Sequence, residues 1–243
     1  MSFVVVIPAR YASQRLNAKA LLKINDKPLV QHTWQRAQLS GAKRIIIATD
    51  NHEIYNECIN FGAEVCMTSQ DHQSGTDRIA EVVAKYNLAQ EIVVNLQGDE
   101  PLMPSEYLTQ VADCLQQDNL ASVATLAVKL EQDIGNENIV KVVLNKFNHA
   151  MYFSRSQIPY PRENNFTWYR HLGIYCYRGD FLQQYCELAR SEIEQVESLE
   201  QLRVLWHGYK IHVGIVDKMP GPGVDSKEDF LKVQQILSNK DYQ

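Results

Sequence analysis

Long apolar runs and an excess of positive charge are missing from this chain of 243 residues. No stretch approaches the roughly 20 apolar residues of a membrane span. The N-terminus, MSFVVVIPAR, also lacks the cationic and apolar segments of a secretory signal. The formal net charge of −5 provides no broad positive field for nucleic acid or an anionic membrane. We therefore expect a cytoplasmic protein that binds neither membranes nor nucleic acids.

Paired cysteines and paired histidines are missing as well. The five cysteines are odd in number, and none of them stands in a C-x-x-C pair. This pattern predicts reduced thiols that mostly fill space in the core. The seven histidines form no H-x-x-x-H pair, so the spacing predicts no zinc site. The cysteines are Cys58, Cys66, Cys114, Cys176 and Cys186.

Neither common phosphate-binding loop is present, because the chain has no G-x-x-x-x-G-K-[ST] and no G-x-G-x-x-G after its first apolar run. That run, residues 4–7, is instead a predicted buried strand, and the loop after it carries Arg10, Arg15 and Lys19. Ligands of open α/β sheets bind at the carboxyl ends of the strands. Three cations there indicate a polyanionic ligand, with arginine forks on phosphate oxygens and lysine as a point charge. Solvated surface residues are the alternative interpretation.

Strand-like apolar runs alternate with helical patterns through the first half of the chain. The predicted strands are 4–7, 45–49, 65–67 and 92–96, and the predicted helices are 28–39, 53–61, 77–86 and 105–117. Four strands then follow with little helix between them, at 121–128, 140–144, 149–153 and 169–177, before helices 180–189 and 198–206, strand 211–216 and helix 227–237. This order predicts an α/β fold with a Rossmann-like, mostly parallel sheet and helices on both faces. We expect one domain, residues 1–243, with a β-rich inserted lobe at about 121–178.

Acidic residues follow three of the predicted strands. Asp50 comes after the second strand, Asp99 after the strand at 92–96, and Asp225 shortly after the strand at 211–216. Because parallel strands share one carboxyl edge, these turns can converge there. Converging carboxylates beside a polyphosphate need a divalent cation, and Mg²⁺ prefers such oxygen ligands. Each aspartate taken alone could equally cap a helix or close a turn.

The segment HQSGTDR, residues 72–78, places small and hydroxylic residues immediately before a predicted helix. Backbone amides at the helix start, together with Arg78, could read the edge of a nucleotide base, and Gly75 would allow close approach. Taken alone, the segment is better explained as an ordinary helix cap.

A further polar group occurs in the strand at 169–177. Strand alternation sends His171, Gly173 and Tyr175 to one face and Arg170 to the other. With Glu200 and Gln201 on the predicted helix at 198–206, these residues could hold a polyhydroxylated acid, whose carboxylate would favour arginine.

Nine motifs occur in order along the chain: IPARYAS-R, ATD, HQSGTDR, NLQGDEP, VKVV, YFSR-IP, RHLGIY, ESLEQLR and PGPGVDS. Together they resemble the 3-deoxy-manno-octulosonate (KDO) cytidylyltransferases, the CMP-KDO synthetase family. The resemblance implies a fold of the nucleotide-diphospho-sugar transferase type and a homodimeric cytoplasmic enzyme of lipopolysaccharide precursor synthesis. The implied reaction joins CTP and KDO, with Mg²⁺, to give CMP-KDO and pyrophosphate.

The resemblance also implies roles for particular residues. Asp99 and Asp225 would bind Mg²⁺, and Arg10, Lys19 and Asp99 would be the catalytic groups. The residues implied to bind CTP are Arg10, Arg15, Lys19, Gln73, Ser74, Gly75 and Arg78. The residues implied to line the sugar site are Gln97, Arg170, His171, Tyr175, Glu200 and Gln201.

One loop departs from the family pattern. The family usually reads R-L-P-G-K-P-L where this chain has Arg15-Leu16-Asn17-Ala18-Lys19-Ala20-Leu21. The loss of two prolines and a glycine changes the backbone freedom of the loop but keeps its cations. Two alternatives therefore stay open: a cytidylyltransferase for another ulosonic acid, such as 8-amino-KDO or a sialic-acid-like substrate, or a catalytically silent CTP-binding regulator. A redox Rossmann enzyme is disfavoured, because the dinucleotide fingerprint is absent.

Overall fold

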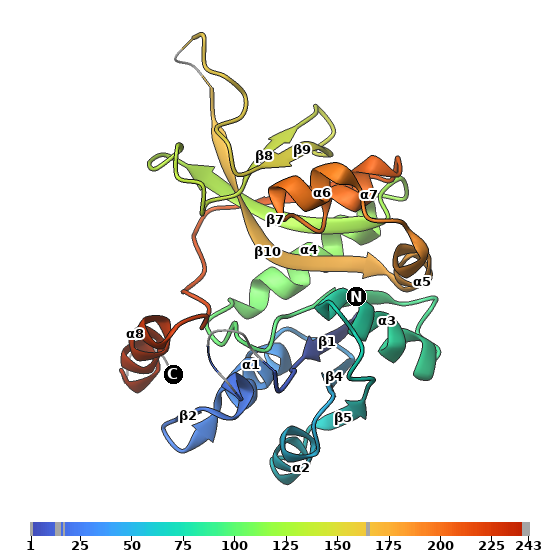
Figure 1. The fold of residues 1–243 in the computed structure, drawn as a ribbon, viewed down its shortest axis with the longest axis vertical. Coiled ribbons are helices and arrows are strands. Elements are labelled where there is room, and N and C mark those ends of the chain that lie inside the picture. Colours follow the sequence, from blue (N-terminus) through green and yellow to red (C-terminus); the bar gives the residue numbers. More distant parts are fainter. Residues whose placement is uncertain (1, 13–15, 17, 164–165, 240–243) are drawn as a thin grey trace.

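A computed structural model describes residues 2–12, 16, 18–163 and 166–239. The strands of its main sheet are β1 (Val4–Pro8), β4 (Arg44–Thr49), β5 (Glu64–Met67), β6 (Ile92–Asn95), β7 (Val123–Leu130), β10 (Trp168–Arg178) and β11 (Ile211–Val216). They lie in the order β11-β7-β10-β6-β1-β4-β5 (Figure 1). Every neighbouring pair is parallel except the two that involve β10, which is antiparallel to β6 and β7. The predicted mostly parallel sheet is confirmed.

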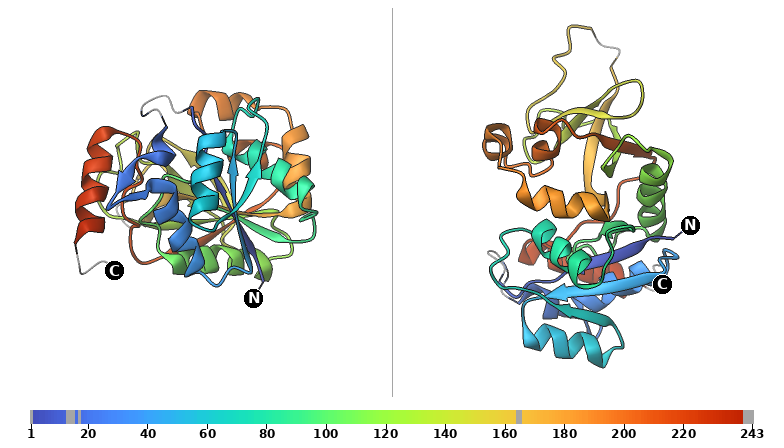
Figure 2. Two further views of the ribbon diagram at one scale, coloured as in Figure 1. Left: turned by 90° about the horizontal axis from the view of Figure 1, so that it is seen from below. Right: turned by 90° about the vertical axis from the view of Figure 1, so that its right-hand side faces the viewer.

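Helices cover both faces of the sheet, as predicted (Figure 2). Within β1, Val5 and Ile7 face one layer and Val4 and Val6 face the other, because successive side chains of a strand alternate. The first face packs against α1 (Leu29–Gln38), α2 (His52–Asn60) and α4 (Ser105–Gln117). The second face packs against α3 (Gly75–Lys85), α5 (Gly179–Glu187) and α7 (Leu202–Trp206). Burial on both faces explains why the first strand reads as an unbroken apolar run.

The four consecutive strands at 121–178 divide between two places. Strands β8 (Lys141–Leu144) and β9 (Ala150–Ser154) form an antiparallel hairpin that branches from the sheet at β10, whereas β7 and β10 lie in the main strand order. Strand β10 serves both parts: Tyr169 and Arg170 pair with β8, and residues 175–178 pair with β6. A run of strand-like segments does not reveal which neighbour each strand will find. For that reason the sequence pattern alone suggested that all four strands belong to one inserted lobe.

Two regions differ from the predicted elements. Ser198 adopts a left-handed conformation (φ 53°) that ends α6 (Glu192–Glu197), so the predicted helix at 198–206 begins only at Leu202. Glu200 and Gln201 consequently lie in the turn before α7. The chain after β1 also forms a short 3₁₀ helix, η1 (Lys19–Leu21), and a hairpin of β2 (Lys23–Ile24) and β3 (Lys27–Pro28), which the sequence analysis missed.

The last helix, α8 (Lys227–Ser238), returns to the N-terminal part of the molecule (Figure 1). Its Val233 packs in a small apolar cluster with Ile24 and Leu29. This contact anchors the segment that carries Asp225. The five cysteines are free thiols, as predicted. No helix in the described part of the chain is long and apolar enough to cross a membrane.

Candidate active site

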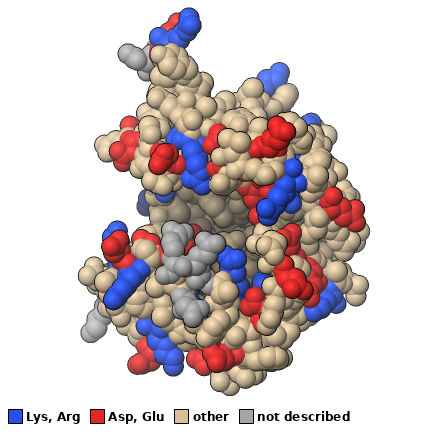
Figure 3. All heavy atoms as spheres, viewed as in Figure 1, with Lys and Arg blue, Asp and Glu red and all other residues tan. Residues whose placement is uncertain are grey.

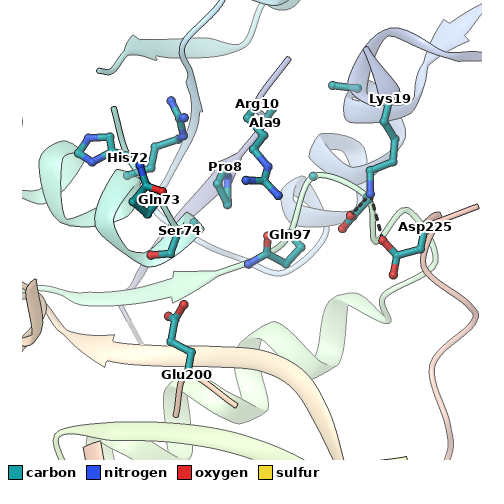
Figure 4. Close-up of a pocket in the computed structure, with 15 residues that line it drawn as sticks. Pro8, Ala9, Arg10, Lys19, His72, Gln73, Ser74, Gln97, Glu200 and Asp225 are labelled. Carbon is teal, nitrogen blue, oxygen red and sulfur yellow. Dashed lines mark hydrogen bonds and ion pairs between the residues drawn. The ribbon is translucent and has the colours of Figure 1, made fainter. Parts of the chain in front are cut away.

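The carboxyl end of β1 lies at the centre of the candidate site (Figure 4). Pro8 and Ala9 are buried, and Arg10 is exposed at the beginning of the next loop. The Ala9 amide donates a hydrogen bond to the Ala48 carbonyl at 2.8 Å. A Cβ at Gly98 would lie 2.8 Å from the Pro8 carbonyl oxygen, so glycine lets the loops after β1 and β6 approach this closely.

A cavity of about 370 Å³ opens beside this strand end, and Figure 3 shows the molecule hollowed between its upper and lower halves. Its walls come from segments that lie far apart in the sequence. The predicted site residues on these walls are Arg10, Lys19, Gln73, Ser74, Gly75, Arg78, Gln97, Asp99, Glu200 and Asp225. The structure therefore brings together most of the side chains expected to bind the nucleotide and the metal.

Asp99 and Asp225 meet on the ammonium group of Lys19. Lys19 Nζ donates to Asp99 Oδ2 in a short contact and to Asp225 Oδ1 at 3.3 Å. The two acidic turns are joined through their backbones, because the Val224 amide donates to the Asp99 carbonyl at 2.8 Å. Two carboxylates that share one cation offer the oxygen ligands that Mg²⁺ prefers.

Glu100 adds a third carboxyl to this cluster, and the sequence analysis gave it no role. Burial, together with the charges of Asp99 and Asp225, raises the pKa of Glu100 to about 8, although Lys19 opposes the shift. A Cβ at Gly223 would lie 2.8 Å from Glu100 Oε1, so the glycine-rich turn packs directly on this carboxyl. The NLQGDEP motif contained the residue but did not show which of its two adjacent acids would contact Lys19 and which would pack against the turn at Gly223.

Helix α3 begins at the wall of the cavity. Ser74 caps it: the Ser74 side chain accepts from the Asp77 amide at 3.1 Å, and the Asp77 side chain accepts from the Ser74 amide at 3.2 Å. The next residue, Gly75, packs against Gln97, because a Cβ at Gly75 would lie 3.4 Å from Gln97 Nε2. The positive end of the helix dipole therefore faces the cavity and favours anionic groups there.

Arg78 lines the cavity and is held by two partners. Its Nη2 donates to Asp50 Oδ2 at 2.7 Å, and its Nη1 makes a short contact with Thr68 Oγ1. Asp50 Oδ1 also accepts from the Tyr11 amide at 3.2 Å. Asp50 follows a strand that ends at the same edge as the turns of Asp99 and Asp225, but it pairs with Arg78 instead of converging with them. Asp50 follows β4, which is separated by β1 from β6, the strand that Asp99 follows.

A smaller cavity of about 140 Å³ adjoins the first and shares Gly75, Gln97 and Glu200 with it. Its other walls carry aromatic and polar side chains, including Thr76, Asn95, Tyr175, Tyr177, Tyr185 and Gln201. A compact polar ligand in this cavity would therefore lie next to a ligand in the larger one.

Two residues of the turn before α7 face the smaller cavity. Glu200 Oε1 accepts a short hydrogen bond from Thr76 Oγ1, and burial raises the pKa of Glu200. Gln201 is buried, and its Nε2 has no hydrogen-bond partner among residues 2–12, 16, 18–163 and 166–239. Burying an unpaired amide donor costs about 1–3 kcal/mol. Gln201 is therefore ready to donate to a ligand oxygen.

Comparison with known proteins agrees with this geometry. A family model described as cytidylyltransferase matches residues 4–211. The chain is 50% identical to 3-deoxy-manno-octulosonate cytidylyltransferase 2 of Actinobacillus pleuropneumoniae serotype 5b, over 99% of this chain and all of that protein. It is also 50% identical to the 3-deoxy-manno-octulosonate cytidylyltransferase of Haemophilus ducreyi, over 98% and 99% of the two chains. This chain belongs to the 3-deoxy-manno-octulosonate cytidylyltransferase family.

Solved structures extend the comparison. A CMP:2-keto-3-deoxy-manno-octonic acid synthetase complexed with CTP superimposes with a TM-score of 0.93 and is 41% identical, covering 98% of this chain and 99% of that one. A cytidylyltransferase from Leptospira borgpetersenii is 15% identical with a TM-score of 0.62, over 98% of this chain and 86% of that one, and shares the fold. The nucleotidyltransferase interpretation of the motifs is confirmed at the level of the family.

Some expected cytidylyltransferase site residues lie apart from the two cavities. His171 packs against the Phe153 ring, with its Nε2 3.0 Å from Thr125 Oγ1, and burial lowers the pKa of His171 to about 3. Arg170 faces a different hollow, which it lines with Asp217. The neutral His171 contacts the wall residue Tyr175 with its ring, at 5.3 Å between centroids, so it supports the smaller cavity from behind.

The loop that departs from the cytidylyltransferase family pattern is only partly described. Arg15 and Asn17 lie outside the described residues. Ala18 adopts a left-handed conformation (φ 51°, ψ 32°) at the position where the family usually has glycine. A left-handed alanine costs roughly 1–2 kcal/mol relative to a right-handed one. The chain thus keeps the turn that directs Lys19 toward the aspartates, but with a residue less suited to it.

Proposed function

We propose that the protein transfers CMP from CTP to the anomeric hydroxyl of KDO, releasing pyrophosphate and supplying CMP-KDO for lipopolysaccharide biosynthesis. The observation that carries this proposal is the pair of adjoining cavities that share Gly75, Gln97 and Glu200. The larger cavity has the cations and the helix N-terminus that suit a nucleoside triphosphate. The smaller cavity has the dense polar lining that suits a sugar acid. The relatives named above support both substrates by their names.

CTP would occupy the larger cavity. Arg10 and Lys19 would neutralise phosphate charge, and the start of α3, with Gln73 and Ser74, would contact the base and ribose. Arg78 is held by Asp50 and Thr68, so it would present a fixed guanidinium to the nucleotide. A prearranged cation of this kind loses little side-chain entropy when the ligand binds.

We propose Mg²⁺ as the cofactor, held by Asp99 and Asp225. The fit rests on their shared contact with the Lys19 ammonium, which shows that both carboxylates can reach one cation. A bound Mg²⁺ supplies charge neutralisation at the phosphates and lowers the pKa of a bound hydroxyl. The side chains of Arg10 and Lys19 would provide the remaining counter-charge to the phosphates.

KDO would occupy the smaller cavity, with its anomeric hydroxyl directed at the shared wall. Gln201 would donate its unpartnered Nε2–H to a substrate oxygen, while Gln97 and Glu200 would orient the sugar from the boundary between the cavities. The hydroxyl oxygen would bond to the α-phosphorus in line as the bond to the pyrophosphate oxygen breaks, and the hydroxyl proton would pass to water. Such transfers depend chiefly on positioning and charge neutralisation, and they need no protein nucleophile.

A substrate matrix tests the proposal. Pyrophosphate release is measured with CTP, UTP, ATP and GTP, each paired with KDO, 8-amino-KDO and a sialic acid. We expect CTP with KDO to give the highest kcat/KM. A higher value with another acid would instead support the alternative ulosonic-acid enzyme. CTP binding without pyrophosphate release from any pair would support the silent regulator.

Asp99→Asn tests the metal assignment. We expect the substitution to abolish turnover while leaving the circular dichroism spectrum unchanged, because the metal loses a ligand and the fold loses only a half-exposed carboxylate. Asp133→Asn is a matched control in the exposed loop between β7 and β8. Near-normal turnover of Asp99→Asn at saturating Mg²⁺ would refute the assignment.

We also propose a cytoplasmic homodimer. Five free thiols support a reducing compartment. Phe147 and Met151 expose 62% and 61% of their surface beside β9, which pairs on only one side among the described strands. Apolar side chains at an open strand edge are typical of an interface. Light scattering on the purified protein would give twice the chain mass of 27.9 kDa, and a monomer at assay concentrations would contradict the proposal.

A further inference from the structure

A cluster of three potential metal ligands, one aspartate and two histidines, lies away from the proposed substrate cavities. Asp118 caps the C-terminus of α4, His149 directly precedes β9, and His212 is the second residue of β11. Ile211 at the start of β11 pairs with Val123 at the start of β7. Because β7 and β11 run parallel to β1 and β6, the cluster lies at the edge of the sheet where these strands begin. The candidate site lies at the opposite edge, where β1 and β6 end.

The three side chains converge on one point. Asp118 Oδ2 lies 2.6 Å from His149 Nε2 and 2.9 Å from His212 Nδ1. All three ligand atoms lie within 4.8 Å of one another. The second carboxylate oxygen, Asp118 Oδ1, accepts from the Leu120 amide at 2.9 Å. This bond orients the carboxylate independently of the two rings, as a second hydrogen bond often orients a metal ligand.

The cluster is shielded but still open to solvent. The side chains of Asp118, His149 and His212 expose 14%, 9% and 18% of their surface, so an ion could reach them from solvent. Burial would raise the pKa of Asp118, but hydrogen bonds from His212 and His149 outweigh it and hold the pKa below its ordinary value. Arg178 Nη2 donates to the Asp118 backbone carbonyl at 2.9 Å. The carboxylate is therefore ionised and faces two imidazoles.

We propose that Asp118, His149 and His212 bind a divalent transition-metal ion of the zinc type. Two imidazole nitrogens and one carboxylate oxygen suit Zn²⁺ and its neighbours, whereas Mg²⁺ and Ca²⁺ prefer oxygen ligands. Ligand atoms around a tetrahedral Zn²⁺ are about 3.3 Å apart, so small side-chain shifts would admit the ion. Each imidazole would carry its proton on the ring nitrogen that faces away from the ion. Water would complete the coordination.

The ion would join three segments of the fold. It would connect the end of α4, the loop before β9 and the start of β11, next to the hydrogen bond from the Val213 amide to the Asn148 carbonyl at 2.8 Å. The β8–β9 hairpin would then be fastened to the main sheet. Because the native fold assembles these ligands and the unfolded chain does not, zinc should raise the unfolding temperature.

Calorimetry on chelator-treated full-length protein tests the site. ZnCl₂ is titrated in saturating MgCl₂, which occupies the Asp99–Asp225 carboxylates. His149→Gln and His212→Gln each remove one ligand nitrogen and keep an amide that can donate to Asp118. His207→Gln is the matched control, because exposed His207 contacts the Ala189 carbonyl at 3.0 Å, away from the cluster.

We expect the wild type and His207→Gln to bind one equivalent of zinc and to gain thermal stability from it. The two ligand variants should bind zinc more than about 100-fold more weakly. This is a larger loss than replacing a residue that only hydrogen-bonds to a metal ligand causes. Equal zinc affinity in all four proteins, or none in the wild type, would overturn the proposal. If the glutamine variants fail to fold, the visible d–d absorption of the Co²⁺-loaded wild type decides: tetrahedral bands that vanish in Asp118→Asn support the site, and their absence from the wild type refutes it.

Discussion

Replacing Asp50 with asparagine would test the role of the negative charge that holds Arg78 at the nucleotide cavity. The Asp50 and Arg78 side chains are 12% and 3% exposed, and they are joined at 2.7 Å. Asparagine keeps the size of the side chain but loses its charge. Its single carbonyl oxygen can accept from the Tyr11 amide or from Arg78, whereas the carboxylate accepts from both.

The size of the effect follows from burial. Removing one partner of a buried ion pair typically costs about 3–5 kcal/mol, because the remaining charge is left without compensation. We therefore expect Asp50→Asn to lower the free energy of unfolding by about 3 kcal/mol or more in urea titrations. We also expect KM for CTP to rise, since both the Arg78 guanidinium and the loop that carries Arg10 lose their common anchor.

Two control substitutions distinguish the effect of burying the ion pair from the effect of losing a hydrogen-bond partner. Arg44 and Glu64 form the same kind of pair with two hydrogen bonds, but their side chains are 34% and 39% exposed, so Glu64→Gln should cost only about 0–1 kcal/mol. Thr68→Val removes the other Arg78 partner and leaves the charge pair, and it should cost about 1–3 kcal/mol. If Asp50→Asn costs no more than Glu64→Gln and leaves KM for CTP unchanged, the anchoring role of Asp50 is refuted.

Three further predictions concern other parts of the molecule. Gln201→Leu should raise KM for the sugar acid at least tenfold with little change for CTP, and equal changes in both KM values would contradict its placement in the sugar pocket. Burial would raise the pKa of Glu81, but hydrogen bonds from Lys85, the Ser69 amide and His72 hold it at about 2, against 4.5 in the unfolded chain. The ionised form therefore stabilises the fold above pH 4.5 and this contribution disappears toward pH 2, so Glu81→Gln should cost up to about 3 kcal/mol at neutral pH and almost nothing near pH 2 in urea titrations. Ala18→Gly relieves a left-handed alanine but adds flexibility to the unfolded chain, so the unfolding free energy should rise by no more than about 1 kcal/mol, and a clear loss of stability would contradict the strain argument.

The strand ends were predictable because sheet geometry is regular. A buried apolar run that ends in a polar turn places its last residues at a known edge of a parallel sheet. This rule explains why Arg10, Asp99 and Asp225 line one cavity, although they are far apart in the sequence. The same rule correctly placed Asp50 at this edge of the sheet, but it could not show which side chain Asp50 would contact. The strand order, with β1 between β4 and β6, decides that Asp50 meets Arg78.

Residues whose position depends on irregular backbone were harder to predict. Strand β10 changes register between Leu172 and Tyr175, and it pairs with β8 before that point and with β6 after it. Alternation correctly put Arg170 and His171 on opposite faces, but it could not show that neither lines the two cavities. A spacing rule could not detect the histidine pair beside Asp118, because His149 lies in the loop before β9 and His212 lies in β11.

The charges at the centre of the site should make binding of the cation depend on binding of the nucleotide. Asp99 and Asp225 contact the Lys19 ammonium, and burial together with the charges of these two aspartates raises the pKa of the neighbouring Glu100. A triphosphate entering alone would increase the repulsion, and a divalent cation entering alone would leave Arg10 without an anionic partner. When both enter together, the cation neutralises the carboxylates and the phosphates while Arg10 meets an anion. The proposed Mg²⁺ and CTP should therefore bind cooperatively, so that each tightens the affinity of the other by the same factor.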